Sequence, residues 1–132
     1  MIEPVAHPVR RRPFGRLLRS FGYAFAGVGY LFRTQPNARI ELAFGIAALG
    51  MATWLNISRV EWAVLILTIA AVIILEGLNT AIEAAVDLAS PDIHPKAKIA
   101  KDVAAGMVLI AAIASVGVGL LILGPPLWEK VM

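Results

Sequence analysis

The residues whose types and spacing could carry chemistry lie in the C-terminal half of a long apolar stretch. They are three acids and one amide: Glu76, Asn79, Glu83 and Asp87. On an α-helix these four positions fall within about 80° of one another. An acid at the centre of a bilayer costs roughly 3 kcal/mol even on the lenient insertion scales, so such residues face protein or water and generally serve a function. The sequence therefore predicts a polar site along one face of this helix.

The helical rise gives the depth of these acids in a membrane. From Trp62, near the start of the apolar stretch, Glu76 is about 21 Å along the helix and Asp87 about 38 Å, against a hydrocarbon core of about 30 Å. The distribution of basic residues, described below, places the following loop in the cytoplasm. Glu76 is therefore expected in the inner leaflet and Glu83 near the cytoplasmic headgroups. Such a site can meet a lipid headgroup from one side and a soluble molecule from the other.

Two carboxylates at this boundary suit phosphoryl transfer. Carboxylate oxygens, with water and phosphate oxygens, are the usual ligands of Mg²⁺. A second carboxylate, partly removed from water, can act as a general base toward a hydroxyl, and Lys101 could neutralise phosphate charge. Structural roles are the alternative: Asp102 could cap a helix, Lys101 could extend toward the headgroups, and Asn79 could join two helices through a hydrogen bond.

Three apolar segments have to position these residues. Hydrophobic residues make up 59% of the 132 residues and charged residues only 16%, which is more apolar than an ordinary soluble domain. A spanning helix needs about 20 mainly apolar residues. The expected spans are 38–57, 61–88 and 100–124, the last ended by Pro125-Pro126. We therefore expect an all-α integral membrane protein with three transmembrane helices in a single domain, 14–132.

A segment of different character, 14–34, precedes the first span. Its large apolar side chains fall within about 60° on a helical wheel, and arginines and tyrosines lie opposite. The apolar side has Phe14, Leu18, Phe21, Phe25 and Phe32, and the other side has Arg12, Arg16, Arg19, Tyr23 and Tyr30. The pattern predicts an amphipathic surface helix in the membrane interface, the alternative being a soluble helix packed on a partner domain. Residues 1–13, rich in Pro and Arg, are expected to be disordered.

The basic residues predict the orientation of the chain. Residues 1–39 contain seven arginines and the single acid Glu3. The second loop region adds three lysines, whereas the first loop and the C-terminal end have one basic residue each. Positive charge accumulates on the cytoplasmic side, so we expect a multi-pass membrane protein with a cytoplasmic N-terminus.

Several functional classes are disfavoured by what the sequence lacks. It has no cysteine and only two histidines, which argues against a disulfide scaffold, a zinc–thiolate site or a histidine-built metal centre. It has neither a Walker-type phosphate-binding loop nor a dinucleotide-binding fingerprint, and we expect no nucleic-acid partner.

The chain resembles the bacterial membrane-integral diacylglycerol kinase and undecaprenol kinase family. The main motif is Glu76-x-x-Asn79-Thr80-Ala81-Ile82-Glu83-x-x-x-Asp87, followed by Ala100-Lys101-Asp102. Shorter matches are Ser20-Phe21-x-Tyr23-Ala24-x-x-Gly27, Asn37-x-Arg39-Ile40 and Glu61-Trp62. The resemblance covers about residues 14–123 and implies a homotrimer with sites shared between neighbouring subunits, which transfers the γ-phosphoryl group of Mg-ATP to the hydroxyl of a membrane lipid.

The resemblance also implies roles for individual residues. Glu76 matches the general base, Glu83 a metal ligand and Lys101 the lysine that contacts phosphate. The remaining matches are to residues in or near the nucleotide site: Arg16, Tyr23, Asn79, His94 and Asp102.

One position departs from the family pattern. The second metal-binding carboxylate of the family falls at Gln35, which offers a neutral oxygen and no charge. Weaker metal binding, or a second metal lost or held differently, is the expected consequence. Glu41, six residues further on, is not assumed to replace the missing acid.

These observations predict an ATP-dependent kinase for a membrane lipid alcohol, with diacylglycerol and undecaprenol both open as the acceptor. The alternative function is a small proton-coupled, multidrug-type transporter in which Glu76 exchanges protons. Against it, the acids gather toward one interface, whereas a transporter site lies near the membrane midplane, and internal repeats are not evident.

Overall fold

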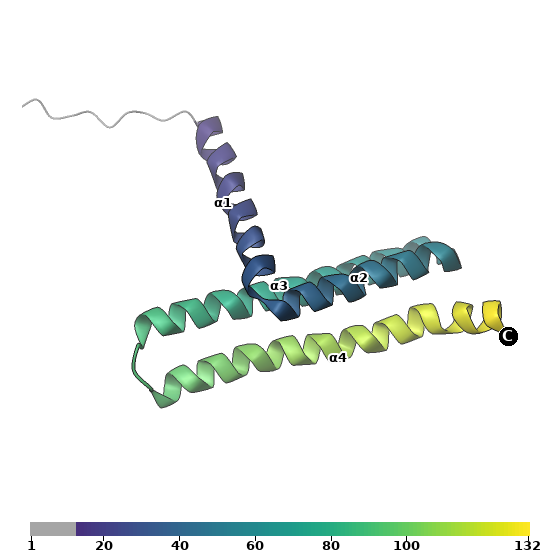
Figure 1. The fold of residues 1–132 in the computed structure, drawn as a ribbon. Coiled ribbons are helices and arrows are strands. Elements are labelled where there is room, and N and C mark those ends of the chain that lie inside the picture. Colours follow the sequence, from purple (N-terminus) through teal and green to yellow (C-terminus); the bar gives the residue numbers. More distant parts are fainter. Residues whose placement is uncertain (1–12) are drawn as a thin grey trace, which may run out of the picture.

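The computed structural model describes residues 13–132 as an all-helical chain (Figure 1). Its helices are α1 (Pro13–Thr34), α2 (Pro36–Leu55), α3 (Arg59–Ala89) and α4 (Pro95–Val131). Within this range α2, α3 and α4 are long and apolar enough to cross a membrane, so the all-helical prediction with three candidate spans is confirmed. The expected disordered segment lies outside the described residues except for Pro13, which opens α1.

Local signals in the sequence set the helix boundaries. Gln35 has an extended backbone before α2, and Pro36 occupies the first helical position, where its missing N–H is not needed. Asn56 ends α2 in the left-handed conformation, with φ 52°. At the start of α3, Ser58 and Glu61 form a reciprocal capping box. These caps allow α2 and α3 to be joined by a very short turn.

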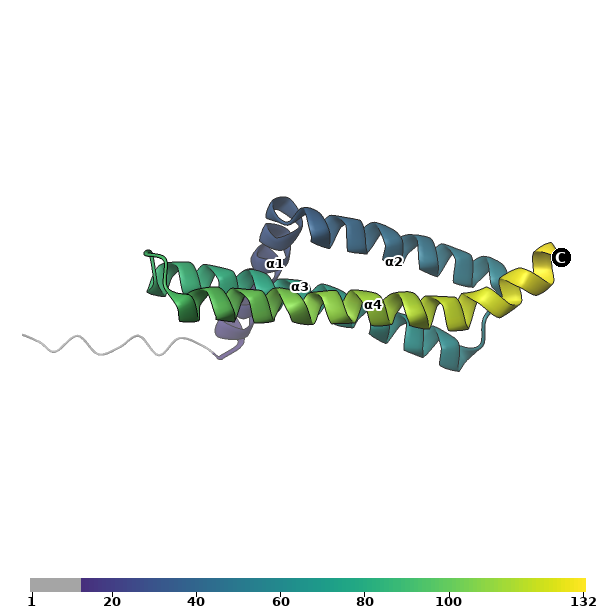
Figure 2. The same cartoon turned by 90° about the horizontal axis from the view of Figure 1, so that it is seen from below.

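The helices pack as a thin bundle from which α1 departs steeply (Figure 1). Helices α3 and α4 run antiparallel side by side along much of their length, and α2 packs against both (Figures 1 and 2). The buried cluster at the end near the α2–α3 turn consists of Ala52, Leu55, Leu65, Ile122 and Leu123. A Cβ atom on Gly45 would lie 2.8 Å from Ile69 Cγ2, so the close approach of α2 to α3 depends on glycine at this position.

Helix α4 extends beyond the two prolines at which the third span was expected to end. It continues through Pro125 and Pro126 to Val131, with a bend at its C-terminal end (Figure 2). Prolines remove backbone donors and bend a helix, but here the last turn is held by α2. The Nζ atom of Lys130 donates to the Trp54 carbonyl oxygen at 2.6 Å and lies 4.7 Å from the centroid of the Trp54 ring.

Candidate active site

The polar stripe of α3 becomes progressively more exposed toward the end of the helix. Glu76 is 2% exposed, Asn79 and Glu83 are half-buried, and Asp87 is exposed. The Nδ2 atom of Asn79 donates to Glu83 Oε1 at 3.2 Å, whereas Asn79 Oδ1 is buried without a hydrogen-bond partner. One helix face therefore offers a sheltered acid at one end and accessible carboxylates at the other.

Helix α4 brings a cation to the exposed end of this stripe. Lys101 Nζ lies 2.7 Å from Asp87 Oδ1 and joins α4 to α3 across the loop 90–94. Lys98 and Asp102 form a second ion pair within the first turns of α4. A polyphosphate approaching this end would meet two lysine side chains and the carboxylates that a bound divalent cation could bridge.

The oxygen atoms near Glu83 fit the preference of Mg²⁺ for hard oxygen ligands. Asn79 Oδ1 is a buried amide oxygen without a donor, and Glu83 is the neighbouring carboxylate. Among residues 13–132, however, no three His, Cys, Asp or Glu side chains are arranged to hold a metal ion by themselves. A cation here would therefore depend on phosphate oxygens, water or further ligands to complete its shell.

Other predicted site residues lie on elements other than α3. Arg16 and Tyr23 lie on α1, and Tyr23 is 76% exposed. His94 is the N-cap of α4, where its Nδ1 accepts a hydrogen bond from the Lys96 backbone N–H at 3.2 Å. Gln35 is half-buried at the N-cap of α2 and makes no side-chain capping hydrogen bond. These positions belong to separate elements.

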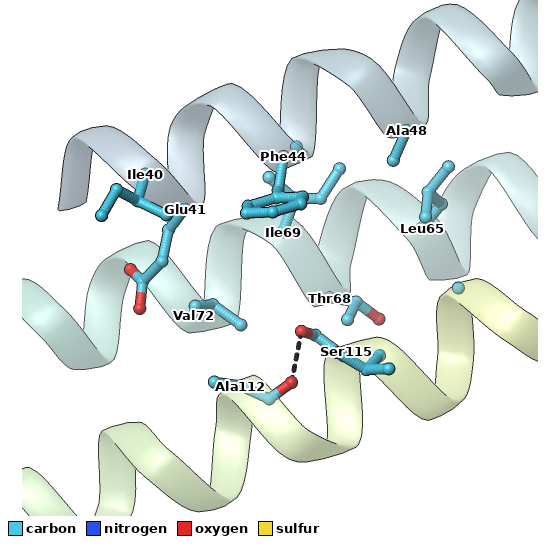
Figure 3. A pocket seen from close by; sticks show the side chains of 13 residues that line it. Ile40, Glu41, Phe44, Ala48, Leu65, Thr68, Ile69, Val72, Ala112 and Ser115 are labelled. Atoms are coloured by element: carbon cyan, nitrogen blue, oxygen red, sulfur yellow. Dashed lines mark hydrogen bonds between the residues drawn. The ribbon is translucent and has the colours of Figure 1, made fainter. Parts of the chain in front are cut away.

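Glu41 is a further acid that the sequence analysis did not place in the site. It lines an apolar cavity of about 440 Å³ between α2, α3 and α4 (Figure 3). One of its carboxylate oxygens, Oε2, is buried without a hydrogen-bond partner, and the carboxylate is close enough to Glu76 for electrostatic repulsion. Its signal in the sequence was that of a lone acid near the start of an otherwise apolar span.

The cavity that Glu41 lines is formed mainly by hydrocarbon side chains. Phe44, Ile69 and Val72 line it, and Thr68 and Ser115 are among its few polar residues. Ser115 Oγ donates to the Ala112 carbonyl oxygen at 2.8 Å, within α4 (Figure 3). The cavity is therefore suited to an apolar occupant.

Comparison with known proteins places these features in one family. A family model described as prokaryotic diacylglycerol kinase matches residues 22–123. A diacylglycerol kinase from Synechocystis sp. is 46% identical, covering 96% of this chain and 78% of the relative. An undecaprenol kinase from Bacillus subtilis is 40% identical, covering 89% of this chain and 95% of the relative. A diacylglycerol kinase from Escherichia coli is 33% identical, covering 78% and 84% respectively.

These relatives are kinases, so the transporter alternative gains no support. The family model also spans the whole polar stripe and the paired Lys101 and Asp87. The chain belongs to the prokaryotic diacylglycerol kinase family.

Proposed function

We propose that this chain is a lipid kinase that transfers the γ-phosphoryl group of ATP to the hydroxyl of diacylglycerol or undecaprenol. The observation that carries the proposal is the gradient along α3, from the sheltered Glu76 to the exposed Asp87 beside Lys101. It joins an apolar region, where a lipid alcohol can reach, to a charged end, where a nucleotide can bind.

The reaction assigns a different task to each end of the stripe. Glu76 takes the proton from the lipid hydroxyl, and the hydroxyl oxygen forms a bond to the γ-phosphorus as the bond to the bridging β–γ oxygen breaks. Glu83 and Gln35 would hold Mg²⁺, which would neutralise phosphate charge, and Asn79 in the nucleotide site would offer a further oxygen, its buried Oδ1. Lys101 offsets the remaining charge on the phosphates. Positioning and electrostatics do most of the work in such a transfer.

The nucleotide site is proposed to be completed by assembly. Arg16, Tyr23, His94 and Asp102 are expected to contact ATP, yet they lie on separate elements of one chain. A homotrimer whose sites are shared between neighbouring subunits would bring such residues together. The exposed apolar faces of the three long helices support an assembled, membrane-embedded state.

The proposed location is the bacterial inner membrane, with the N-terminus and the loop 90–94 in the cytoplasm. Helix α1 is proposed to lie in the interface, because Phe14, Phe21 and Phe25 are more than half exposed. Buried in the headgroup region, these aromatic side chains would leave the arginines of α1 in contact with water and phosphate groups.

The test is direct phosphorylation of each lipid. Purified protein in detergent is incubated with labelled ATP, Mg²⁺ and either diacylglycerol or undecaprenol, and the labelled lipid is counted after extraction. We expect label in at least one lipid and none without Mg²⁺. Label in neither lipid would refute the proposed function, and the ratio between the two lipids identifies the acceptor.

A further inference from the structure

The ion pair between Asp87 and Lys101 ties the charged ends of α3 and α4 together. Asp87 lies one helical turn beyond Glu83 on the same face of α3. Lys101 interacts electrostatically with both of these acids. The pair therefore holds the Lys101 ammonium against Asp87, one helical turn from the carboxylate that is proposed to hold the metal.

The second pair at this end, Lys98 with Asp102, differs in kind. It joins neighbouring turns of one helix, and its side chains are 75% and 61% exposed. Exposed pairs of this type contribute little. Lys101 is 37% exposed and Asp87 is 66% exposed, but their contact joins two helices. It is this link between helices that restricts where the ammonium can be.

We propose that Asp87 is a positioning residue that holds Lys101 ready for the phosphates of the nucleotide. An ammonium has three donors, and the contact to Asp87 Oδ1 uses one of them, which leaves two for phosphate oxygens. Lysine is long and flexible, so a side chain that is already held loses less freedom when the nucleotide binds. The inference rests on the proposed function, in which Lys101 contacts phosphate.

The direction in which triphosphate affinity changes when Asp87 is removed distinguishes a positioning role from simple electrostatic repulsion. An acid near a polyphosphate repels it, so an Asp87 that merely adds negative charge would weaken nucleotide binding, and its removal would tighten binding. A positioning Asp87 has the reverse effect, because its removal releases Lys101. The change should also be confined to ligands that carry phosphates.

The experiment measures binding of a non-hydrolysable ATP analogue with Mg²⁺, and of adenosine, to the full-length protein in detergent. For Asp87→Ala we expect triphosphate affinity to fall about tenfold and the KM for ATP to rise in parallel, with adenosine binding and the KM for lipid unchanged. Asp87→Glu keeps the charge and should restore most of the affinity. The matched control is Asp92→Ala, an exposed acid in the loop 90–94, which should stay within about twofold of the original chain.

A double-mutant cycle tests whether Asp87 acts through Lys101. In a Lys101→Met background, Asp87→Ala should change triphosphate affinity by less than about twofold. If the double variant loses affinity by the product of the two single losses, the inference is overturned. Tighter or unchanged triphosphate binding in Asp87→Ala alone would also overturn it. Equal losses for adenosine and triphosphate would also overturn it, because they indicate a general structural role. If Asp87→Ala does not fold, Asp87→Asn takes its place with the same expected direction.

This outcome is separable from that of the proposed function. A chain that binds the triphosphate but phosphorylates neither lipid would refute the kinase proposal. The triphosphate affinities of Asp87→Ala and the original chain could still be compared. A chain that phosphorylates lipid, with Asp87→Ala binding the triphosphate normally, would refute only the positioning role.

Discussion

Asn79 holds Glu83 through a hydrogen bond of 3.2 Å from Nδ2 to Oε1, while its own Oδ1 stays buried and without a partner. A buried polar atom of this kind is rare unless something absent from the chain satisfies it. The amide thus orients a carboxylate and presents an oxygen on the same helix face. This relationship makes the Asn79–Glu83 pair the strongest candidate for a cation site along α3.

The first prediction concerns this pair. Asn79→Leu keeps a side chain of similar volume but removes two polar atoms. These are the Nδ2 donor that orients Glu83 and the Oδ1 atom that has no hydrogen-bond partner. We expect the Mg²⁺ concentration for half-maximal lipid phosphorylation to rise about 10- to 100-fold, as for other residues that orient metal ligands. A Mg²⁺ titration of the kinase rate measures this. An unchanged Mg²⁺ requirement would show that the pair does not hold the metal.

The second prediction separates the two glutamates of the stripe. Glu76→Gln should lower kcat by about 10²- to 10⁴-fold, the usual contribution of a general base, and leave binding of Mg-ATP intact. Glu83→Gln should weaken Mg-dependent nucleotide binding as well. Both are measured by lipid-dependent ATP consumption and by nucleotide titration. Glu61→Gln, at the opposite end of α3, is the control and should keep its turnover; near-normal turnover in either test variant would contradict its role.

The third prediction concerns the repulsion between Glu41 and Glu76. Both acids sit inside the helical bundle, and Glu41 Oε2 has no hydrogen-bond partner. Glu41→Gln removes a charge at nearly constant shape, so both the cost of burying a carboxylate and its repulsion by Glu76 disappear. We expect the midpoint of thermal unfolding in detergent to rise by roughly 3–5 °C. A fall in the midpoint would mean that the Glu41 carboxylate has a stabilising partner in the assembled protein.

The fourth prediction compares two glycines. Gly45→Ala would place a Cβ 2.8 Å from Ile69 Cγ2, whereas a Cβ at Gly119 meets nothing within 4 Å. Overpacking of this kind costs about 1–3 kcal/mol, so Gly45→Ala should lower the unfolding midpoint and Gly119→Ala should not. Ile69→Ala, which removes the Cγ2 atom, should cost less in the Gly45→Ala background than in the original chain. Equal effects at both glycines would show that α2 does not approach α3 so closely.

The sequence predicted the helices and the polar stripe because both follow from local rules. Apolar runs of the right length specify spanning helices, and the spacing of Glu76, Asn79 and Glu83 places them on one face whatever surrounds them. The sequence placed the end of the third span at Pro125-Pro126, whereas α4 continues to Val131. The contact of Lys130 with Trp54, 76 residues away, holds the extra turns.

Contacts between helices are what the sequence could not supply. The pairing of Lys101 with Asp87 and the approach of Glu41 to Glu76 depend on how α2 and α4 rotate about their axes against α3. That rotation is set by packing, for example of Gly45 against Ile69. The family resemblance marked Lys101 as a phosphate contact, but its partner emerged only from the fold.

The last prediction restores the acid that the family pattern has at Gln35. The side chain of Gln35 makes no capping hydrogen bond, so Gln35→Glu changes charge without breaking a contact, and a negative charge at the start of α2 is favoured by the helix dipole. Two carboxylates hold Mg²⁺ more tightly than a carboxylate and an amide. The Mg²⁺ concentration for half-maximal activity should therefore fall in Gln35→Glu, with the KM for lipid unchanged. The control Asn37→Asp, at the exposed second position of α2, adds the same charge nearby and should leave the Mg²⁺ requirement unaltered. If both substitutions lower the requirement equally, the effect is general electrostatic attraction at the cytoplasmic end and Gln35 is not a metal ligand.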